Sequence, residues 1–314
     1  MNGRQSDIAL HLDGLSVEAP FDGRTLVDEV RLTIKSGETL CLVGESGSGK
    51  SMTARALMGL CPPELRVRMR NIAVAGNGTA PAQHMALVPQ RALSALNPLL
   101  EIRTQMTEAF VSRRLGSRTE AEARAIQLLG EVGIESPEKR LQQYPHQFSG
   151  GQCQRILIAM ALMCGPKLLI ADEPTTALDP SSQMQVLRLL KRLRRSIGLG
   201  LLLITHDLAV AAATADRLAV MYAGQIVEDG PARQVLAAPS HPYTRALIGC
   251  TPGLRAGDFG HLPRPIPGVM QPRETGAPGC PFVMRCDVAK SECRQGTIAN
   301  ISRDGDRQVR CVLA

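Results

Sequence analysis

One run of eight residues has the composition and spacing of a phosphate-binding loop. It fits the pattern GxxxxGK(S/T) and consists of Gly44, Glu45, Ser46, Gly47, Ser48, Gly49, Lys50 and Ser51. Glycines let the backbone wrap closely around phosphate oxygens, so that amide N–H groups face them. Lys50 adds a positive charge, and the Ser51 hydroxyl is suited to Mg²⁺. The loop therefore predicts a magnesium–nucleotide site.

Two carboxylates follow an apolar segment more than a hundred residues later. Residues 168–171 read Leu-Leu-Ile-Ala, and Asp172 and Glu173 come next. Ligands of open α/β sheets bind at the carboxyl ends of the strands. Asp172 suits the magnesium shell, and Glu173 is the candidate general base that polarises a water toward the γ-phosphate. Capping of the next helix is the structural alternative, but the strand before the pair and the phosphate loop favour catalysis.

The elements that position these groups are predicted by hydrophobic periodicity. Alternating patterns at 8–17 and 26–34 predict antiparallel strands flanking the first core strand, and continuous apolar runs at 168–171 and 199–204 predict buried parallel strands. Further strands are expected at 39–43, 71–75 and 85–88. Helices are expected after Lys50 and at 102–141 (with breaks at Gly116 and Gly133), 152–164 and 181–197. The predicted class is α/β: a P-loop domain with an antiparallel β subdomain, a helical insert and a Cys-containing C-terminal extension.

Four more segments complete an ordered set of motifs. They are Gln90, Phe148-Ser149-Gly150-Gly151-Gln152, Ala177-Leu178-Asp179 and Thr205-His206-Asp207. With the two motifs above, they resemble the Walker A, Q-loop, signature, Walker B, D-loop and H-loop of ABC ATPases. Shorter phrases resemble the ATP-binding subunits of oligopeptide, dipeptide and nickel importers: residues 94–98, 144–146, 158–162, 220–224 and 241–244.

This resemblance implies that two such chains sandwich two ATP molecules head to tail. The signature of one chain, with Ser149, Gly150, Gly151 and Gln152, then faces the phosphate loop of the other, and Asp179 also belongs to the nucleotide site. Taken from one chain alone, Ser149 is an ordinary helix cap. The resemblance also gives catalytic roles to Gln90, which reaches Mg²⁺ and the attacking water, and to His206, which reaches the γ-phosphate.

Some positions are less typical of the family. Phe21 lies where the family has an aromatic ring that stacks on adenine, and filling a core edge is its alternative role. Phe148 replaces the common Leu of the signature, Cys153 follows Gln152, and Arg91 stands where an acidic residue is frequent. The segment between residues 61 and 90 is short, which is more similar to the nickel branch than to the peptide branch.

Four cysteines near the C-terminus have the spacing C-x5-C-x6-C-x17-C: Cys280, Cys286, Cys293 and Cys311. They resemble the cysteine-bearing extension of the peptide-importer family, some members of which are thought to hold a 4Fe-4S cluster. Four thiolates fit either such a cluster or tetrahedral zinc, and unligated thiols in a loosely folded tail are the third interpretation. The other five cysteines have apolar neighbours and are expected in the core.

Composition argues against several other classes of protein. The chain of 314 residues carries 36 basic and 29 acidic side chains, but with three Tyr, five Phe and no Trp it lacks the stacking surface of a single-strand nucleic-acid binder. Its longest uncharged apolar run, residues 156–166, is far shorter than the roughly 20 residues of a membrane-spanning helix. The N-terminus does not resemble a secretory signal. We therefore expect a cytoplasmic location, and the family resemblance implies a peripheral position on the cytoplasmic face of the inner membrane.

These observations predict two regions, an ABC ATP-binding domain at 1–250 with a helical subdomain at about 91–165, and a Pro/Gly-rich extension at 251–314. The expected function is ATP hydrolysis, with ATP and Mg²⁺, that powers import of a peptide, nickel or a related solute. Expected partners are permease subunits, a second ATP-binding subunit and, indirectly, an extracytoplasmic solute-binding protein, but no nucleic acid. Alternatives are a soluble ABC ATPase acting on a nucleic-acid or other macromolecular assembly, and a metal-sensing regulator.

Overall fold

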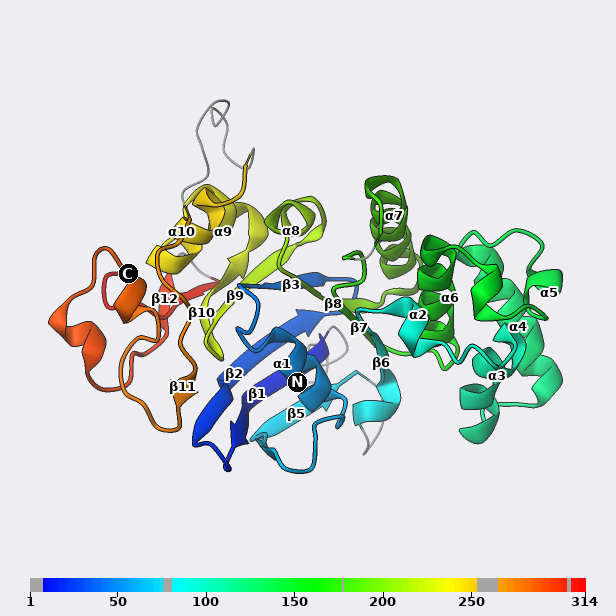
Figure 1. The fold of residues 1–314 in the computed structure, drawn as a ribbon, viewed down its shortest axis with the longest axis horizontal. Coiled ribbons are helices and arrows are strands. Elements are labelled where there is room, and N and C mark those ends of the chain that lie inside the picture. Colours follow the sequence, from blue (N-terminus) through cyan, green and yellow to red (C-terminus); the bar gives the residue numbers. More distant parts are fainter. Residues whose placement is uncertain (1–7, 76–80, 177, 253–264, 304–305) are drawn as a thin grey trace, which may run out of the picture.

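Two β-sheets and a helical region make up the computed structural model, which describes residues 8–75, 81–176, 178–252, 265–303 and 306–314. Figure 1 shows the helical insert at one end of the molecule and the C-terminal extension at the other. Among the described residues, no helix is both long and apolar enough to cross a membrane.

The smaller sheet is antiparallel and is built from the N-terminal segments. Its strand order is β11-β2-β1-β4, and β5 also pairs with β1. The bounds are β1 Ile8–Ala19, β2 Arg24–Lys35, β4 Arg66–Arg68, β5 Asn71–Val74 and β11 Arg273–Glu274. The strands predicted at 8–17, 26–34 and 71–75 are therefore present. The expectation that the first two flank the first core strand was wrong, because they pair with each other in this separate sheet.

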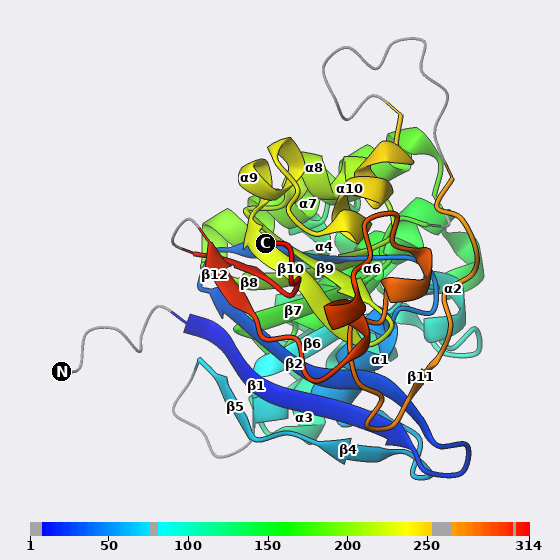
Figure 2. The ribbon, with the colours of Figure 1, turned by 90° about the vertical axis from the view of Figure 1, so that its left-hand side faces the viewer.

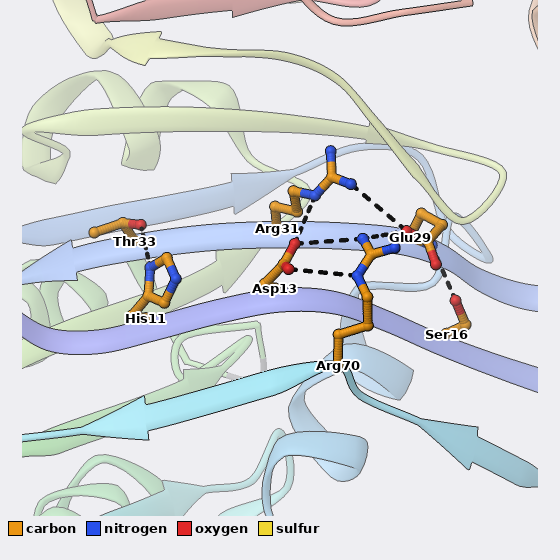
Figure 3. Close-up of polar contacts among 7 residues, drawn as sticks. All are labelled: His11, Asp13, Ser16, Glu29, Arg31, Thr33 and Arg70. Atoms are coloured by element: carbon orange, nitrogen blue, oxygen red, sulfur yellow. Dashed lines mark hydrogen bonds and ion pairs between the residues drawn. The ribbon is translucent and has the colours of Figure 1, made fainter. Parts of the chain in front are cut away.

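A polar network crosses the open face of this sheet (Figure 3). Arg31 Nε donates to Asp13 Oδ1 at 2.7 Å, and Arg70 Nε donates to Asp13 Oδ2 at 3.3 Å. These two arginines lower the pKa of Asp13. Gly14 has a φ of +66°, and a Cβ there would lie 2.6 Å from Arg70 Nε, so a glycine is needed for Arg70 to reach Asp13. The network lies on β1 and β2 and joins them to the connection between β4 and β5.

The larger sheet has eight strands in the order β12-β13-β10-β9-β3-β8-β7-β6. The first core strand, β3, pairs in parallel with β8 and β9, and β7 lies between β6 and β8, also in parallel. The bounds are β3 Thr39–Val43, β6 Met85–Val88, β7 Leu168–Asp172, β8 Gly200–Thr205, β9 Arg217–Tyr222, β10 Gln225–Pro231, β12 Ile301–Arg303 and β13 Arg307–Val309. The apolar runs predicted as buried parallel strands are confirmed in β7 and β8.

Alternating residues of the core strands pack into two hydrophobic clusters. In β3, Leu40 and Leu42 pack with the antiparallel sheet and α1, whereas Cys41 and Val43 pack with the helices on the other face. Residues of β7 and β8 divide in the same way. Because both faces are covered, these strands are apolar at nearly every position. This burial fixes the loops at their carboxyl ends, where the candidate site lies.

The predicted helices form at the expected places. The helical insert contains α3 Ile102–Ser112, α4 Arg118–Glu131 and α5 Pro137–Arg140, and α4 starts at a capping box between Ser117 and Glu120. Gly133 follows α4 with a φ of +77°, as a helix-ending glycine does. The remaining helices are α1 Lys50–Leu57, α2 Ala92–Ala95, α6 Gly150–Leu162, α7 Pro180–Ile197, α8 Leu208–Thr214, α9 Ala232–Ala237 and α10 Pro242–Gly249.

The C-terminal extension adds strands to both sheets, as Figure 2 shows from the side. Strand β11 pairs with β2 of the antiparallel sheet, and β13 pairs with β10 of the larger sheet. Short 3-10 helices at Val283–Arg285 and Ser291–Arg294 carry or flank three of its cysteines. The predicted boundary near residue 250 stays a prediction. The extension is held to the ATP-binding region by these ladders rather than by a linker alone.

Candidate nucleotide-binding site

The phosphate loop links the buried end of β3 to α1. Lys50 is 5% exposed, and its Nζ donates to the carbonyl oxygens of Gly44 and Glu45, each at 2.8 Å. Burial lowers the pKa of Lys50, and the carboxylates of Glu173, Asp172 and Glu45 oppose that shift. The lysine charge is thus held inside the loop, where phosphate oxygens are expected to replace the carbonyl contacts.

Glycine is required at the start of the helix for two reasons. Gly49 has a φ of +106°, a conformation that side chains disfavour. A Cβ at Gly49 would also lie 2.6 Å from the Leu26 carbonyl oxygen of β2. The loop can therefore pack against the antiparallel sheet only with a glycine here.

Two of the three predicted magnesium ligands, Ser51 and Asp172, are in contact, whereas Gln90 bonds to Glu173. Ser51 Oγ donates to Asp172 Oδ1 at 3.0 Å, which joins the first turn of α1 to the end of β7. Burial raises the pKa of Asp172, and the Ser51 hydrogen bond opposes that rise. A hydroxyl and a carboxylate oxygen at this distance suit Mg²⁺, which binds through one or two protein oxygens, substrate phosphates and water.

Glu173 is the centre of the polar contacts beyond β7. Its carboxylate accepts from Gln90 Nε2 at 2.8 Å and from Thr176 Oγ1 at 2.9 Å, and lies 3.0 Å from His206 Nδ1. Its φ of +47° turns the chain as the strand ends, and its N–H donates to the Ile204 carbonyl oxygen at 2.9 Å. Burial alone would raise the pKa of Glu173, but hydrogen bonds from His206 and Thr176 contribute to a net lowering. The group is therefore a carboxylate near neutral pH.

These residues share one open cavity of about 720 Å³. Its lining includes Gly44, Glu45, Ser46, Gly47, Gly49, Lys50, Ser51, Gln90, Glu173 and His206. The structure thus brings the phosphate loop and all three predicted catalytic residues to the same place. Thr176 also lines the cavity, and sequence reasoning missed it because a lone threonine beyond a strand carries no signal of its own.

The signature residues do not line this cavity. Ser149 is the N-cap of α6 and forms a capping box with Gln152, in which Gln152 N donates to Ser149 Oγ at 3.3 Å. Gly150 lines a separate cavity of about 290 Å³. Gly151 lies against α7, where a Cβ would come 3.1 Å from Ser182 Oγ. Within one chain, the signature residues therefore form the start of α6 and do not line the phosphate-loop cavity.

The D-loop also serves a local role in the single chain. Asp179 caps α7 by accepting from the N–H groups of Ser181 and Ser182, both at 3.0 Å. The Ser182 hydrogen bond is the main reason that the pKa of Asp179 is lowered. Ala177 of the same motif lies outside the described residues.

Phe21 lies in the turn between β1 and β2 and is 72% exposed. It is not buried as a core edge residue would be. Its role as an adenine-stacking ring stays a prediction.

Replacing Phe21 with alanine is expected to raise the Michaelis constant for ATP severalfold, because base–aromatic stacking contributes roughly 1–3 kcal/mol per base. The turnover number at saturating ATP should change little, since a ring that stacks on adenine does not contact the γ-phosphate. Steady-state phosphate release at graded ATP concentrations measures both values. An unchanged Michaelis constant would reject the stacking role.

The four cysteines of the extension line one small cavity. It measures about 10 Å³, roughly one water molecule, and His241 forms part of its wall. Cys293 Sγ accepts from Lys290 N and Cys311 Sγ from Leu313 N, each at 3.4 Å. Burial raises the pKa of Cys280 to about 11. Among the described residues, no group of three or more His, Cys, Asp or Glu side chains is placed to hold a metal ion.

Two further contacts to the phosphate loop come from beyond residue 240, and sequence reasoning missed both. Glu45 N donates to Tyr243 Oη at 2.9 Å, and Arg285 Nη1 donates to the Glu45 carboxylate at 3.0 and 3.1 Å. The sequence of residues 241–244 resembles that of the importer subfamily, but this resemblance does not predict a contact with the phosphate loop. Neither contact has a local sequence signal.

Comparisons with known proteins agree with this geometry. Residues 27–176 match the family described as ABC transporter, and residues 227–293 match the family described as oligopeptide/dipeptide transporter, C-terminal region. The dipeptide transport ATP-binding protein DppD of Escherichia coli K12 is 41% identical, with 96% of this chain and 95% of that protein covered. The Bacillus subtilis DppD is 40% identical over 97% and 94%, and the E. coli oligopeptide transport protein OppD is 39% identical over 92% and 89%.

Solved structures show the same fold. The cbiO1 protein of Clostridium perfringens, part of the transporter complex cbiONQ, superposes with a TM-score of 0.62 at 25% identity, over 74% of this chain and 92% of that one. An ATP-binding subunit of an ABC transporter gives 0.59 at 27% identity, over 73% and 92%. These relatives do not favour a soluble ABC ATPase acting on a macromolecular assembly. Sequence identity over nearly the whole chain, the matched families and the assembled motifs together place this ATPase among the ATP-binding subunits of the oligopeptide/dipeptide family of ABC transporters.

Proposed function

We propose that this chain binds and hydrolyses ATP to power import of a peptide through membrane-spanning permease subunits. Residues 227–293 match the C-terminal region of oligopeptide/dipeptide transporters, and this match is the main support for a peptide as the transported solute. The relatives named above are dipeptide and oligopeptide transport proteins. The site provides the chemistry: the phosphate loop and Glu173 line one cavity, and Asp172 accepts a hydrogen bond from Ser51 of that loop.

The position of the signature supports action as a pair of ATP-binding subunits. Ser149 and the first N–H groups of α6 form a helix start suited to an anion, but they do not line the phosphate-loop cavity of their own chain. A second subunit placed head to tail would supply that helix start to the γ-phosphate. Glu173 then activates the attacking water, Gln90 orients the water and Mg²⁺, and His206 contacts the γ-phosphate.

The helical subdomain at about 91–165 is proposed as the region that receives the permease. It projects from one end of the molecule in Figure 1. Leu99 is 82% exposed at its start, which leaves apolar surface for a partner. The chain would then lie on the cytoplasmic face of the inner membrane. An extracytoplasmic solute-binding protein would deliver the solute to the permease and so act with this chain only indirectly. No nucleic acid is expected as a partner.

Uptake measurements test this function. Cells that lack the chain are given labelled dipeptide or labelled nickel, with and without the wild-type gene and with a Glu173→Gln variant. We expect the wild-type gene alone to restore dipeptide uptake. Restoration of nickel uptake instead would assign the nickel branch, and restoration of neither solute would overturn import of both.

We further propose that Cys280, Cys286, Cys293 and Cys311 hold a metal centre, with a 4Fe-4S cluster as the first candidate and zinc as the second. All four thiols line one cavity, and backbone N–H groups donate to two of the sulfurs, as is common around cluster ligands. Burial lowers the pKa of the neighbouring His241 to about 4, so its imidazole is neutral. The cavity of about 10 Å³ is small for a cluster, so the thiols would have to move apart to hold one.

Metal analysis after anaerobic purification decides between these candidates. A cluster should give about four iron atoms per chain and a broad visible absorbance, whereas zinc should give about one metal ion per chain in a colourless protein. Replacing Cys293 with serine should remove the metal, and replacing Cys61, which is remote from the cavity, should not. Colourless protein without either metal would refute the proposal.

A further inference from the structure

The Glu45 side chain in the phosphate loop is held by the C-terminal extension. Glu45 occupies a position that the loop pattern leaves free, and its side chain is 30% exposed. Arg285 Nη1 donates to both of its oxygens, at 3.0 and 3.1 Å, from a guanidinium-bearing side chain that is only 6% exposed. The two residues are 240 positions apart in the sequence. A buried arginine from the extension therefore contacts the side chain of a phosphate-loop residue.

Arg285 is itself fixed from several sides. Its Nε donates to the Pro267 carbonyl oxygen at 2.7 Å, and Nη2 donates to the Ile266 carbonyl oxygen at 3.3 Å. Its guanidinium carbon lies 5.8 Å from the centre of the Tyr222 ring and 6.0 Å from that of Phe282. These contacts hold the Arg285 side chain in one conformation, so its positively charged guanidinium is already positioned beside the Glu45 carboxylate.

The Glu45 backbone shows why this contact matters for ATP. Its carbonyl oxygen accepts from Lys50 Nζ at 2.8 Å, and its N–H donates to Tyr243 Oη at 2.9 Å. The residue thus connects the phosphate-loop lysine to α10 through its backbone and to the extension through its carboxylate. Glu45 also lines the cavity that receives the phosphates, and an unpaired negative charge on its side chain would repel them.

The extension also forms a wall beside the loop. A cavity of about 380 Å³ lies between Glu45, Ser46 and Gly47 on one side and residues 268–273 on the other. A Cβ at Gly47 would lie 3.4 Å from Met270 Cε, so the two segments touch. Arg285 anchors the beginning of this wall through the Ile266 and Pro267 carbonyl groups.

We propose that Arg285 is a positioning residue for ATP, which neutralises the Glu45 carboxylate and holds the phosphate loop in its binding conformation. The inference rests on the ATP site and not on the transported solute. Failure of dipeptide uptake would therefore leave it intact.

A double-mutant cycle on the full-length protein tests the proposal, with the dissociation constant of Mg-ATP as the readout. Arg285→Ala should raise that constant about tenfold, because it leaves a carboxylate unpaired beside the phosphates. In a Glu45→Gln background the same change should raise it by no more than about twofold. The turnover number at saturating ATP should stay within about twofold, since Glu173 and its partners are untouched.

Two further variants complete the experiment. Arg294→Ala removes an exposed arginine of the same extension, which contacts only Met284 Sδ at 3.5 Å among the contacts described, and should not change ATP affinity. If Arg285→Ala fails to fold, Arg285→Gln provides the test, because its amide can still donate a hydrogen bond but lacks the positive charge that neutralises Glu45. Unchanged affinity in these Arg285 variants, or equal losses in both Glu45 backgrounds, would overturn the proposal.

Discussion

ATP turnover is expected to fall by about 10²–10⁴-fold when Glu173 is replaced with glutamine, while ATP binding is retained. The amide keeps the shape of the side chain and can still accept from Gln90 and Thr176, which lie 2.8 and 2.9 Å from the carboxylate. It cannot take a proton from the attacking water. The turnover number from phosphate release and the dissociation constant of a fluorescent ATP analogue separate the two effects.

A matched control shows whether the loss of turnover depends on position 173 or would follow from the loss of a negative charge elsewhere on the protein. Glu138→Gln makes the same chemical change on the exposed surface of α5 and should leave turnover within about twofold. Near-normal turnover in Glu173→Gln would reject Glu173 as the general base. Loss of ATP binding as well would show that the contacts with Gln90 and His206 serve mainly to hold the site together.

The central strands and the phosphate loop were predictable because their signals are local. Strands β7 and β8 are covered on both faces, so their burial appears in the sequence as unbroken apolar runs. The loop at Gly49 needs a glycine for its φ and for its contact with Leu26, which gives the motif a fixed pattern. The rule that ligands bind at the carboxyl ends of the strands placed Asp172 and Glu173 at the site, whereas the role of His206 came from the family resemblance.

Other features depend on distant partners and left no such pattern. Strand β10 contains Glu228 and Asp229 at positions that are buried or half-buried, so its composition does not indicate a core strand. These charges are tolerated because Arg307 and Arg217 pair with them. The contact of Arg285 with Glu45 spans most of the chain, and only the folded extension brings the two side chains together.

Replacing Arg307 with alanine is expected to lower the free energy of unfolding by about 3–5 kcal/mol. The Glu228 side chain is fully buried and Arg307 is 4% exposed. The Arg307 guanidinium donates to Glu228 and to the Ala238 carbonyl oxygen, and Gly230 makes room for its stem, with a Cβ there only 3.0 Å from Arg307 Cγ. Without the arginine, a carboxylate remains buried with only two backbone donors, Ser240 and His241. Urea unfolding followed by circular dichroism measures the loss.

Two variants show whether this loss comes from the unpaired charge. Adding Glu228→Gln to Arg307→Ala should recover part of the stability, because a neutral amide costs less to bury than a carboxylate. Arg303→Ala removes an exposed arginine of β12 that donates to Ser240 Oγ at 3.1 Å, and should change the free energy of unfolding by less than about 0.5 kcal/mol. Equal destabilisation by Arg303→Ala and Arg307→Ala would contradict the buried-pair argument. It would mean that the buried charge of Glu228 gives Arg307 no larger role than an exposed arginine of the same extension has.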